Sequence, residues 1–547
     1  MRKKNYFLLA LASLAFAACT SENLIDEGGG HVIGDNETAW ISLGIRKPIT
    51  RNLNTPNEHN GTADETNIDN ATLLFFNGHT SSSVLTNVVP FDNTKIGQVT
   101  SAPEAFKVSK SAKSVLVVVN PHNLPALNPG TTTFGAVNAV VTNTAESLMG
   151  TGNDEFMMTN AKGDLEPSMA GTGASQELVL HPTKADAESN KLTLFVDRVV
   201  AKVRVQAKKT SDVATIGDSY WTLNVKNKKY YPVSKRIKTL LDTPTPHDIY
   251  ALGSNREDPN YDNTACAWLP NTAAAAQTNY NLEYDYYTEA NPPAAGVWKE
   301  AQTTIDGSDP DGNAPKVEYC LENTQRKEDN MHAYTTHVLL KTTFLPNSYQ
   351  LPNKTTTAVQ EADNDWIAIK GGFYTYATLM EWIESELVNK YKQINPDTYT
   401  TELTDYFNAY LGVVNAAVPI PDKAAFEAAQ ITAEAQADAL KLLFKGKEAT
   451  VKAKGAFTDG TVNYYSGAET YYQIMIKHDD ADDINNEHGE FGVVRNSVYD
   501  VIVSKFRNPG YPTIPDPDPA KPDEAESWLS LEITVNPWTW YRQEEEL

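Results

Sequence analysis

Residues 40–45 read Trp40-Ile41-Ser42-Leu43-Gly44-Ile45, and residues 529–536 read Leu529-Ser530-Leu531-Glu532-Ile533-Thr534-Val535-Asn536. Every second residue is aliphatic in both stretches: Ile41, Leu43 and Ile45 near the N-terminus, and Leu529, Leu531, Ile533 and Val535 near the C-terminus. Alternation with a period of two predicts half-buried β-strands. Arg51 follows the first stretch, so cleavage there would remove one strand and leave an apolar groove. The last strand of another copy has the pattern to fill that groove by strand addition.

The first 18 residues are expected to be a signal peptide rather than part of the fold. Residues 2–4 are basic, and the apolar stretch 6–18 is too short to span a bilayer as a stable helix. Small residues precede Cys19, as in bacterial lipoproteins, so Cys19 is the expected lipidation site. The alternative is an ordinary secretory signal with a chance cysteine. Residues 19–51 would form a propeptide that contains the removable strand.

The composition argues against nucleic acid and anionic membrane surfaces as partners. The 547 residues carry 70 acidic and 46 basic side chains, a net charge of −24, which polyanions repel. The length is sufficient for two or more domains with full cores. Aromatic residues make up 10%, a content that suits β-sheet faces better than disorder. Cys266 and Cys320 either pair or lie as separate buried thiols, and the sequence leaves both possibilities open.

Short strand patterns separated by turn signals predict two β-sandwich domains, at residues 52–210 and 211–507. Within residues 197–205 one side of the expected strand is apolar and the other is mostly basic. The apolar side holds Val199, Ala201, Val203 and Val205, and the other side holds Arg198, Val200, Lys202 and Arg204. Helical spacing and many alanines predict a helical insertion in the second sandwich at about 376–445.

The last part of the chain, residues 508–547, is expected to be an arm followed by a donor strand. Residues 508–526 alternate proline with aspartate, a composition that favours an extended, fairly stiff segment. This arm is expected to carry the final strand away from Val503. Pro537 lacks a backbone donor and is expected to end the ladder of that strand.

The chain resembles the fimbrillins of type V pili, and most of all the major (shaft) subunit of the minor, or short, fimbriae. The resemblance spans nearly the whole chain and rests on the order of several stretches. They are Phe16-Ala17-Ala18-Cys19, the segment 40–51, Asp197-Arg198-Val199-Val200-Ala201-Lys202-Val203, Tyr319-Cys320-Leu321-Glu322-Asn323-Thr324, Phe491-Gly492-Val493-Val494-Arg495-Asn496-Ser497-Val498-Tyr499, and Val535-Asn536-Pro537-Trp538.

The resemblance implies a mainly β fold of two transthyretin-like β-sandwich domains, the second carrying the insertion. It implies export as a lipidated outer-membrane precursor, cleavage by an arginine-specific surface protease, and polymerisation by donor-strand exchange into extracellular fimbriae that support adhesion. Carried over to this sequence, cleavage follows Arg51, with Arg46 as the alternative site. The implied partners are further copies joined head to tail, accessory and tip pilins, and host receptors or other bacteria.

No residue pattern predicts catalysis, a cofactor or a metal site, so a non-enzymatic structural protein is expected. The acidic runs within 306–313 and 479–487 are expected to be solvated turns rather than calcium loops. His332 and His337 have no third ligand nearby in the sequence, and we expect ordinary histidines rather than zinc ligands. The alternative function is that of a monomeric glycan-binding surface lipoprotein. Trp538 and Trp540 would then stack on sugars, but we expect them instead to anchor the end of the donor strand or to fill a sandwich edge.

Overall fold

The structure is a computed structural model that describes residues 37–46, 59–60, 62, 64–122, 124–152, 154–161, 165–167, 178–233, 235–236, 256–260, 274–302, 316–325, 330–352, 355–369, 371–379, 381, 462–478, 490–523 and 529–539. The predicted mainly β fold is confirmed over these residues, where the longest helix, α6 (Ala274–Glu283), has 10 residues. No helix in these ranges is long and apolar enough to cross a membrane. Almost all of the predicted insertion at 376–445 falls outside them and stays a prediction.

The N-terminal part of the chain forms a seven-stranded sheet. Its order is β4 (Leu85–Phe91), β3 (Ala71–Phe76), β6 (Ser114–Val119), β8 (Met158–Asn160), β9 (Leu192–Arg198), β1 (Thr38–Arg46) and β5 (Ala105–Ser109). Strand β6 is buried at every residue, as its unbroken apolar sequence requires. Short helices close the ends of this region: α1 (Gly97–Thr100), α2 (Phe134–Val137) and α3 (Lys184–Ser189).

Two further sheets form the middle of the molecule. The first has the order β19 (Val317–Leu321), β10 (Val200–Ala207), β29 (Ser497–Phe506), β30 (Leu529–Thr539) and β2 (His59–Asn60). The second has the order β11 (Ala214–Ile216), β21 (His337–Pro346), β12 (Tyr220–Asn224) and β18 (Lys299–Glu300), with β27 (Glu469–Met475) also paired to β21. Both sheets contribute buried residues to one hydrophobic core, which is distinct from the core of the seven-stranded sheet.

Smaller elements complete the described chain. A three-stranded sheet joins β25 (Gly372–Tyr374), β24 (Trp366–Ile369) and β26 (Val462–Tyr465). Two-stranded pairs are β13 (Lys226–Asn227) with β17 (Tyr284–Asp285), β14 (Lys229–Tyr230) with β7 (Val141–Thr142), β15 (Lys235–Arg236) with β16 (Arg256–Glu257), β20 (Asn323–Thr324) with β28 (Gly492–Val493), and β22 (Tyr349–Gln350) with β23 (Thr356–Thr357). The 3-10 turns are η2 (Asp64–Thr66), η3 (Ala145–Leu148) and η7 (Ser466–Ala468).

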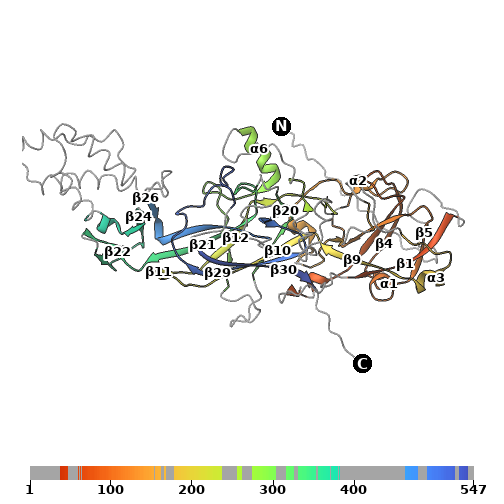
Figure 1. The fold of residues 1–547 in the computed structure, drawn as a ribbon, viewed down its shortest axis with the longest axis horizontal. Helices are drawn as coiled ribbons and strands as arrows, with labels where there is room; N and C mark the ends of the chain where they lie inside the picture. The colour runs from red at the N-terminus through yellow and green to blue at the C-terminus, as the bar shows by residue number, and fades with distance from the viewer. Residues whose placement is uncertain are drawn as a thin grey trace, which may run out of the picture.

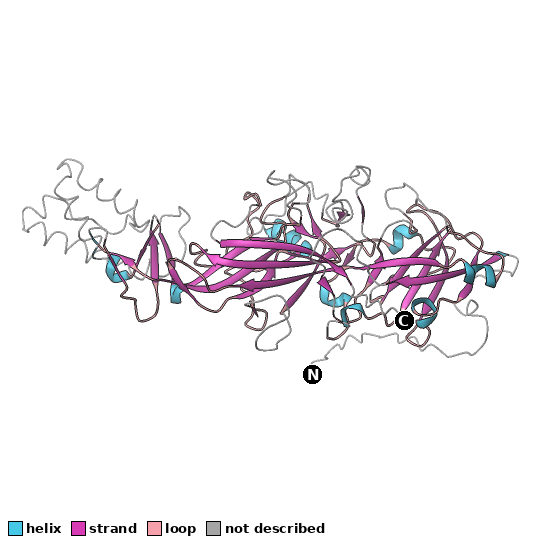
Figure 2. Ribbon diagram, turned by 60° about the horizontal axis from the view of Figure 1, so that its bottom comes forward, coloured by secondary structure: helices cyan, strands magenta, loops and turns pink. Residues whose placement is uncertain are grey.

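The molecule is elongated, and its sheets follow one another along the long axis. Figure 1 shows the seven-stranded sheet at one end, the two five-stranded sheets in the middle, and β24 with β26 at the other end. Figure 2 shows the long strands of the middle region running along the same axis. The two cores meet at consecutive residues, because Val200 belongs to the first and Ala201 to the second. Neighbouring side chains of a strand point to opposite faces.

Both faces of β10 are buried, which the sequence did not predict. Its basic side chains lie in the interior: Lys202 is 4% exposed and Arg204 is 7% exposed. Each is paired there with a carboxylate. Arg204 donates two hydrogen bonds of 2.6 Å to the carboxylate of Asp500, and Lys202 Nζ lies 2.6 Å from Glu65 Oε1. Buried charges of this kind are tolerated only when they are paired.

Glu65 ties the N-terminal segment to the middle sheet. Besides Lys202, its Oε1 accepts a hydrogen bond of 2.7 Å from the Tyr319 hydroxyl on β19. Its backbone carbonyl accepts one of 2.8 Å from Arg198 Nε. Arg198 also donates from Nη1 to Asn496 Oδ1 at 3.2 Å. This cluster therefore links four segments that are far apart in the sequence.

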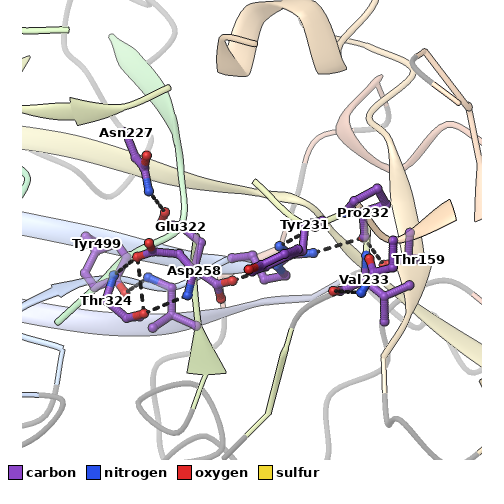
Figure 3. Close-up of polar contacts among 12 residues, drawn as sticks. Thr159, Asn227, Tyr231, Pro232, Val233, Asp258, Glu322, Thr324 and Tyr499 are labelled. Atoms are coloured by element: carbon purple, nitrogen blue, oxygen red, sulfur yellow. Dashed lines mark hydrogen bonds and ion pairs between the residues drawn. The ribbon is translucent and has the colours of Figure 1, made fainter. Parts of the chain in front are cut away.

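A second buried cluster holds the chain where it crosses between the two cores. Arg495 donates to Glu322 Oε2 at 3.2 Å, to the Pro232 carbonyl at 3.2 Å and to the Tyr231 carbonyl at 2.9 Å. From the other side, the Thr159 hydroxyl donates to the same Pro232 carbonyl at 3.1 Å. Figure 3 shows Tyr231 and Pro232 lying between the Glu322 side chain and Thr159. The backbone carbonyls of Tyr231 and Pro232 are therefore held by hydrogen bonds from two separate parts of the chain.

We predict that the Glu65–Lys202 pair makes the protein more sensitive to acid. Burial raises the pKa of Glu65, but Lys202 and the hydrogen bonds from Tyr319 and Thr62 outweigh it and lower the pKa from 4.5 to about 2. The pair stabilises the fold above pH 4.5, and this stabilisation is lost as the pH falls towards 2. The wild type should lose up to about 3 kcal/mol over this range through this group. The measurement is urea unfolding against pH for the wild type and Glu65→Gln.

Glu188 provides the matched control, because it forms an exposed ion pair with Lys184 on α3. Glu188→Gln should leave the pH profile unchanged, since exposed pairs contribute little to stability. At pH 7, Glu65→Gln should itself destabilise the protein by about 3–5 kcal/mol, because it leaves the Lys202 ammonium buried without its counter-ion. Equal acid sensitivity of Glu65→Gln and the wild type would contradict the assignment.

Candidate functional site

Strand β1 is inserted between two strands, with a different polarity towards each. Residues Thr38–Ser42 pair with β5 in antiparallel register, Ile41 opposite Phe106. Residues Leu43–Arg46 pair with β9 in parallel register, Ile45 opposite Leu194. In the seven-stranded order β5 is the terminal strand and β1 is its only neighbour. Removing β1 would therefore leave β5 without a ladder partner and β9 with one free edge.

The inward face of β1 belongs to the core of the seven-stranded sheet. Ile41, Leu43 and Ile45, the residues of the predicted removable strand, are 1%, 0% and 2% exposed. All three belong to the core cluster of that sheet. The opposite side of the strand is also partly covered, since Ser42 is 1% exposed and its Oγ donates to the Pro103 carbonyl at 3.4 Å. The slot that β1 fills is therefore apolar on one face and close-fitting on the other.

Of the two candidate cleavage residues, the structure describes Arg46 but not Arg51. Arg46 is the last residue of β1, where its side chain is exposed while its backbone stays in register opposite Phe195. Arg51 lies outside the described residues, as does Cys19, the predicted lipidation site. Cleavage at either arginine and lipidation at Cys19 stay predictions.

The terminal strand does not leave its own sheet, and here the sequence-based expectation was wrong. The 11-residue β30 pairs antiparallel with β29 from Phe506 opposite Leu529 to Ser497 opposite Pro537. Val503, from which the arm was expected to carry the strand away, lies opposite Leu531. The arm instead returns the chain, so that β30 covers the free edge of β29. Ladder formation by a long edge strand outweighs the stiffness of the prolines.

The ladder with β29 ends at Pro537, as expected, but the strand itself does not. Strand β30 continues past it, with Trp538 opposite His59 and Thr539 opposite Asn60 of β2 in parallel register. A proline is tolerated near the edge of a sheet because its missing donor costs least there. Apart from these two residue pairs β30 is paired on one side only, by β29. Leu529 is 3% exposed and packs in the core of the middle region. Leu531, Ile533 and Val535, the other residues of the predicted donor strand, are placed here by their backbone register.

The Pro/Asp arm is docked against the middle region. Tyr511 and Tyr471 exchange backbone hydrogen bonds of 2.8 and 2.7 Å. Ile514 is 3% exposed and packs with Leu339 and Tyr471. Near the end of the arm, the backbone amide of Asp523 donates to the Asn330 carbonyl at 2.9 Å. The arm thus adds buried contacts at both of its ends, which the sequence did not predict; only the isolated apolar residues among its prolines hint at them.

The histidines, cysteines and acidic runs singled out from the sequence are described only in part. Within the described ranges, no group of three or more histidine, cysteine or acidic residues is placed to hold a metal ion. Burial lowers the pKa of His332 to about 3 and that of His337 to about 4, so both imidazoles are neutral near pH 7. Cys320 is a buried free thiol, and burial raises its pKa above the usual range. Cys266 and the acidic run 479–487 lie outside the described residues.

The sequence of the C-terminal region matches a known family. Residues 463–544 match the profile described as "Major fimbrial subunit protein type IV, Fimbrillin, C-terminal". This C-terminal region belongs to the fimbrillin family. The matched residues include β27, β29, the docked arm and β30. The fimbrillin match therefore covers the segment that was expected to donate a strand.

Solved fimbrial structures resemble this chain only loosely. A fimbrilin from Porphyromonas gingivalis is 14% identical, with a TM-score of 0.39 over 93% of this chain and 99% of that chain. The C-terminally truncated tip fimbrial protein from the same organism is 10% identical, with a TM-score of 0.32 over 92% and 100%. These scores are too low to transfer a function. No curated protein sequence matches the chain.

We predict that the docking of the arm weakens as the pH rises. Burial raises the pKa of Asp523 from 3.8 to about 7, with Glu490 adding to this effect and the Thr335 hydroxyl and Lys521 opposing it. The docked arm therefore binds a proton that a released arm would not hold. Docking is strongest below pH 3.8 and weakens as the pH rises towards 7, by up to about tenfold per pH unit. Hydrogen-exchange protection factors of residues 508–523 should fall between pH 5 and pH 8.

Asp523→Asn should abolish most of this pH dependence, because an amide does not titrate. Asp518 is exposed on the same arm and offers the control, so Asp518→Asn should retain the wild-type profile. A profile for Asp523→Asn that follows the wild type would show that another group controls the docking.

Proposed function

We propose that this fimbrillin is the structural shaft subunit of a surface fimbria and that it polymerises by donor-strand exchange. The position of β1 is the observation that carries the proposal. It pairs with β5 along its first half and with β9 along its second half, and it supplies Ile41, Leu43 and Ile45 to the core. It also precedes every other described element in the chain. A single cut after β1 therefore detaches a strand that the rest of the fold needs.

An incoming strand would restore the ladders and refill the core that the loss of β1 leaves open. In its own subunit β30 pairs with β29 from Leu529 to Pro537 and with β2 at Trp538 and Thr539. In the slot of β1 its first residues would pair with β5 and its later residues with β9. Each buried backbone group that is left unpaired costs about 1–3 kcal/mol, and each aliphatic side chain that fills the groove contributes about 1.5–3 kcal/mol. These terms oppose the loss of the β29 ladder and of the Leu529 contacts.

The contact between copies is head to tail and generates an open filament rather than a closed dimer. The proposal includes the processing steps expected from the sequence. The precursor is exported, lipidated at Cys19 and held at the outer membrane, and an arginine-specific surface protease cuts after Arg51 or Arg46. The mature subunit then joins extracellular fimbriae with accessory and tip pilins. Adhesion to host receptors or other bacteria is the consequence of this assembly, with no enzymatic step.

We predict that cleavage is sufficient to start assembly. Precursor treated with an arginine-specific protease should form fibres in electron micrographs and ladders that resist SDS. A variant with both Arg46→Ala and Arg51→Ala should stay monomeric, because β1 remains in its slot. N-terminal sequencing of the fibres should give Asn52 for cleavage at Arg51, or Lys47 for cleavage at Arg46. A cut protein that remains monomeric and binds polysaccharide would support the glycan-binding alternative.

A peptide of residues 526–539 provides a test that leaves the folded subunit intact. It should bind the cut protein and block fibre growth, because it occupies the slot of β1. It should not bind the uncut Arg46→Ala/Arg51→Ala variant. The control peptide carries Leu531→Asp and Ile533→Asp, which place charges against the apolar core, and it should fail to block growth.

A further inference from the structure

The first and last strands share more than an alternation of apolar residues. Residues 40–45 read Trp-Ile-Ser-Leu-Gly-Ile, and residues 528–533 read Trp-Leu-Ser-Leu-Glu-Ile. Tryptophan, serine, leucine and the final isoleucine stand at equivalent places in the two stretches. The chain has only 9 tryptophans among 547 residues, so a tryptophan at the head of both stretches defines one alignment of the two strands.

We propose that this alignment is the register of exchange, with residues 528–533 of one copy replacing residues 40–45 of the next. This inference rests on the proposed donor-strand exchange and adds its residue-level specificity. Leu529, Leu531 and Ile533 then enter the places of Ile41, Leu43 and Ile45. Trp528 and Ser530 take the places of Trp40 and Ser42.

The polarity of the slot agrees with this alignment. Strand β1 runs antiparallel to β5 and parallel to β9. An incoming strand restores both ladders in their present form only if it runs in the same direction as β1. The two sequences match when both are read from the N-terminal to the C-terminal end. The alignment and the ladder geometry therefore require the same orientation.

Shifts of two residues also keep the apolar face of the incoming strand towards the core. The surroundings of Ser42 distinguish the proposed register from these shifted ones. Ser42 is 1% exposed, and its Oγ lies 3.4 Å from the Pro103 carbonyl oxygen. In the proposed register Ser530 arrives there and donates the same hydrogen bond. A shift of two residues in one direction brings Glu532, which would set a buried carboxylate against a carbonyl oxygen. A shift in the other direction brings Trp528, whose indole is far larger than the serine that fits there.

The Trp40 position adds a second selective contact. The Trp40 ring is half-buried, and Lys107 Nζ lies 5.6 Å from its ring centroid. The Trp40 backbone also exchanges hydrogen bonds of 2.8 Å with His181. A tryptophan at this position therefore receives a cation–π contact in addition to its burial. In the proposed register Trp528 is the side chain that inherits this contact.

At the position of Gly44 the incoming strand would fit the slot less well than β1 does. A Cβ atom at Gly44 would lie 3.2 Å from Pro103 Cγ, which is closer than an ordinary contact. Glu532 arrives there in the proposed register, so the side chain of Pro103 must shift by a few tenths of an ångström. Glu532→Gly should therefore increase the rate or extent of assembly. Its effect has the opposite sign from that of substitutions in the matched residues.

Disulfide trapping in assembled fibres tests the register directly. Ser42 lies opposite Ala105 on β5, so Ser530→Cys in one copy should crosslink to Ala105→Cys in the next. The protein carries both substitutions, is cut with the protease and is oxidised after assembly. Crosslinks between copies are counted on non-reducing gels, with each single-cysteine variant as the background. Glu532→Cys and Trp528→Cys, each combined with Ala105→Cys, report the two shifted registers.

The proposal expects the pair of Ser530→Cys and Ala105→Cys to give at least tenfold more crosslinked ladder than either shifted pair. Fibres in which a shifted pair dominates would overturn the register while leaving donor-strand exchange in place. Fibres in which none of the three pairs crosslinks would place another segment on β5 and overturn the register as well. A failure of all cut proteins to assemble would instead contradict the proposed function.

Discussion

Loss of a strand from inside a sheet exposes backbone groups on its former neighbours and an apolar groove, and these contacts are regained only when another strand takes its place. In this protein β1 is such a strand, because its first half pairs with β5 in antiparallel register and its second half with β9 in parallel register. Its side chains also fill the core of the seven-stranded sheet. Everything proposed about assembly follows from this one set of ladders, because its loss exposes both unpaired backbone and an apolar groove. A single cut after β1 would separate it covalently from every other described element.

Two buried polar clusters connect segments of the fold that are far apart in the sequence. The buried ion pair of Glu65 with Lys202 anchors the segment between the candidate cleavage sites and the seven-stranded sheet. Arg495 donates hydrogen bonds to the Tyr231 and Pro232 carbonyls, where the chain crosses between the two cores. Both clusters consist of buried charges with partners on other segments, so their geometry is fixed by several contacts at once. The residues of both clusters lie outside strand β1.

Local patterns in the sequence predicted much of what depends on neighbouring residues. The alternation of Ile41, Leu43 and Ile45 predicted a strand with one apolar face, and the structure buries all three. The alternation of residues also predicted that Ala201, Val203 and Val205 lie on the same apolar face of β10. The sequence did not predict that Lys202 lies buried on the opposite face, because its partner Glu65 is distant in the sequence and nothing local marks the pair. The burial of Lys202 depends on pairing with a residue distant in the sequence, and the spacing of neighbouring residues does not reveal such a pair.

The terminal arm shows the same limit in another form. Its prolines predicted an extended segment, but Ile514 and Asp523 dock it against the middle region, and β30 returns to pair with β29. Composition describes how stiff a segment is and says little about which surface it contacts. In this structure the terminal strand lies on its own subunit. The proposed exchange would move it from the ladder of β29 to the slot between β5 and β9.

Cryo-electron microscopy of fibres grown from protease-cut protein is the most direct test of this account. The account predicts continuous density between β5 and β9 that carries the side chains of residues 528–533 from the neighbouring copy, with β29 no longer covered by its own β30. Density in that slot that traces to residues 38–46 of the same subunit, with β30 still paired to β29, would contradict it.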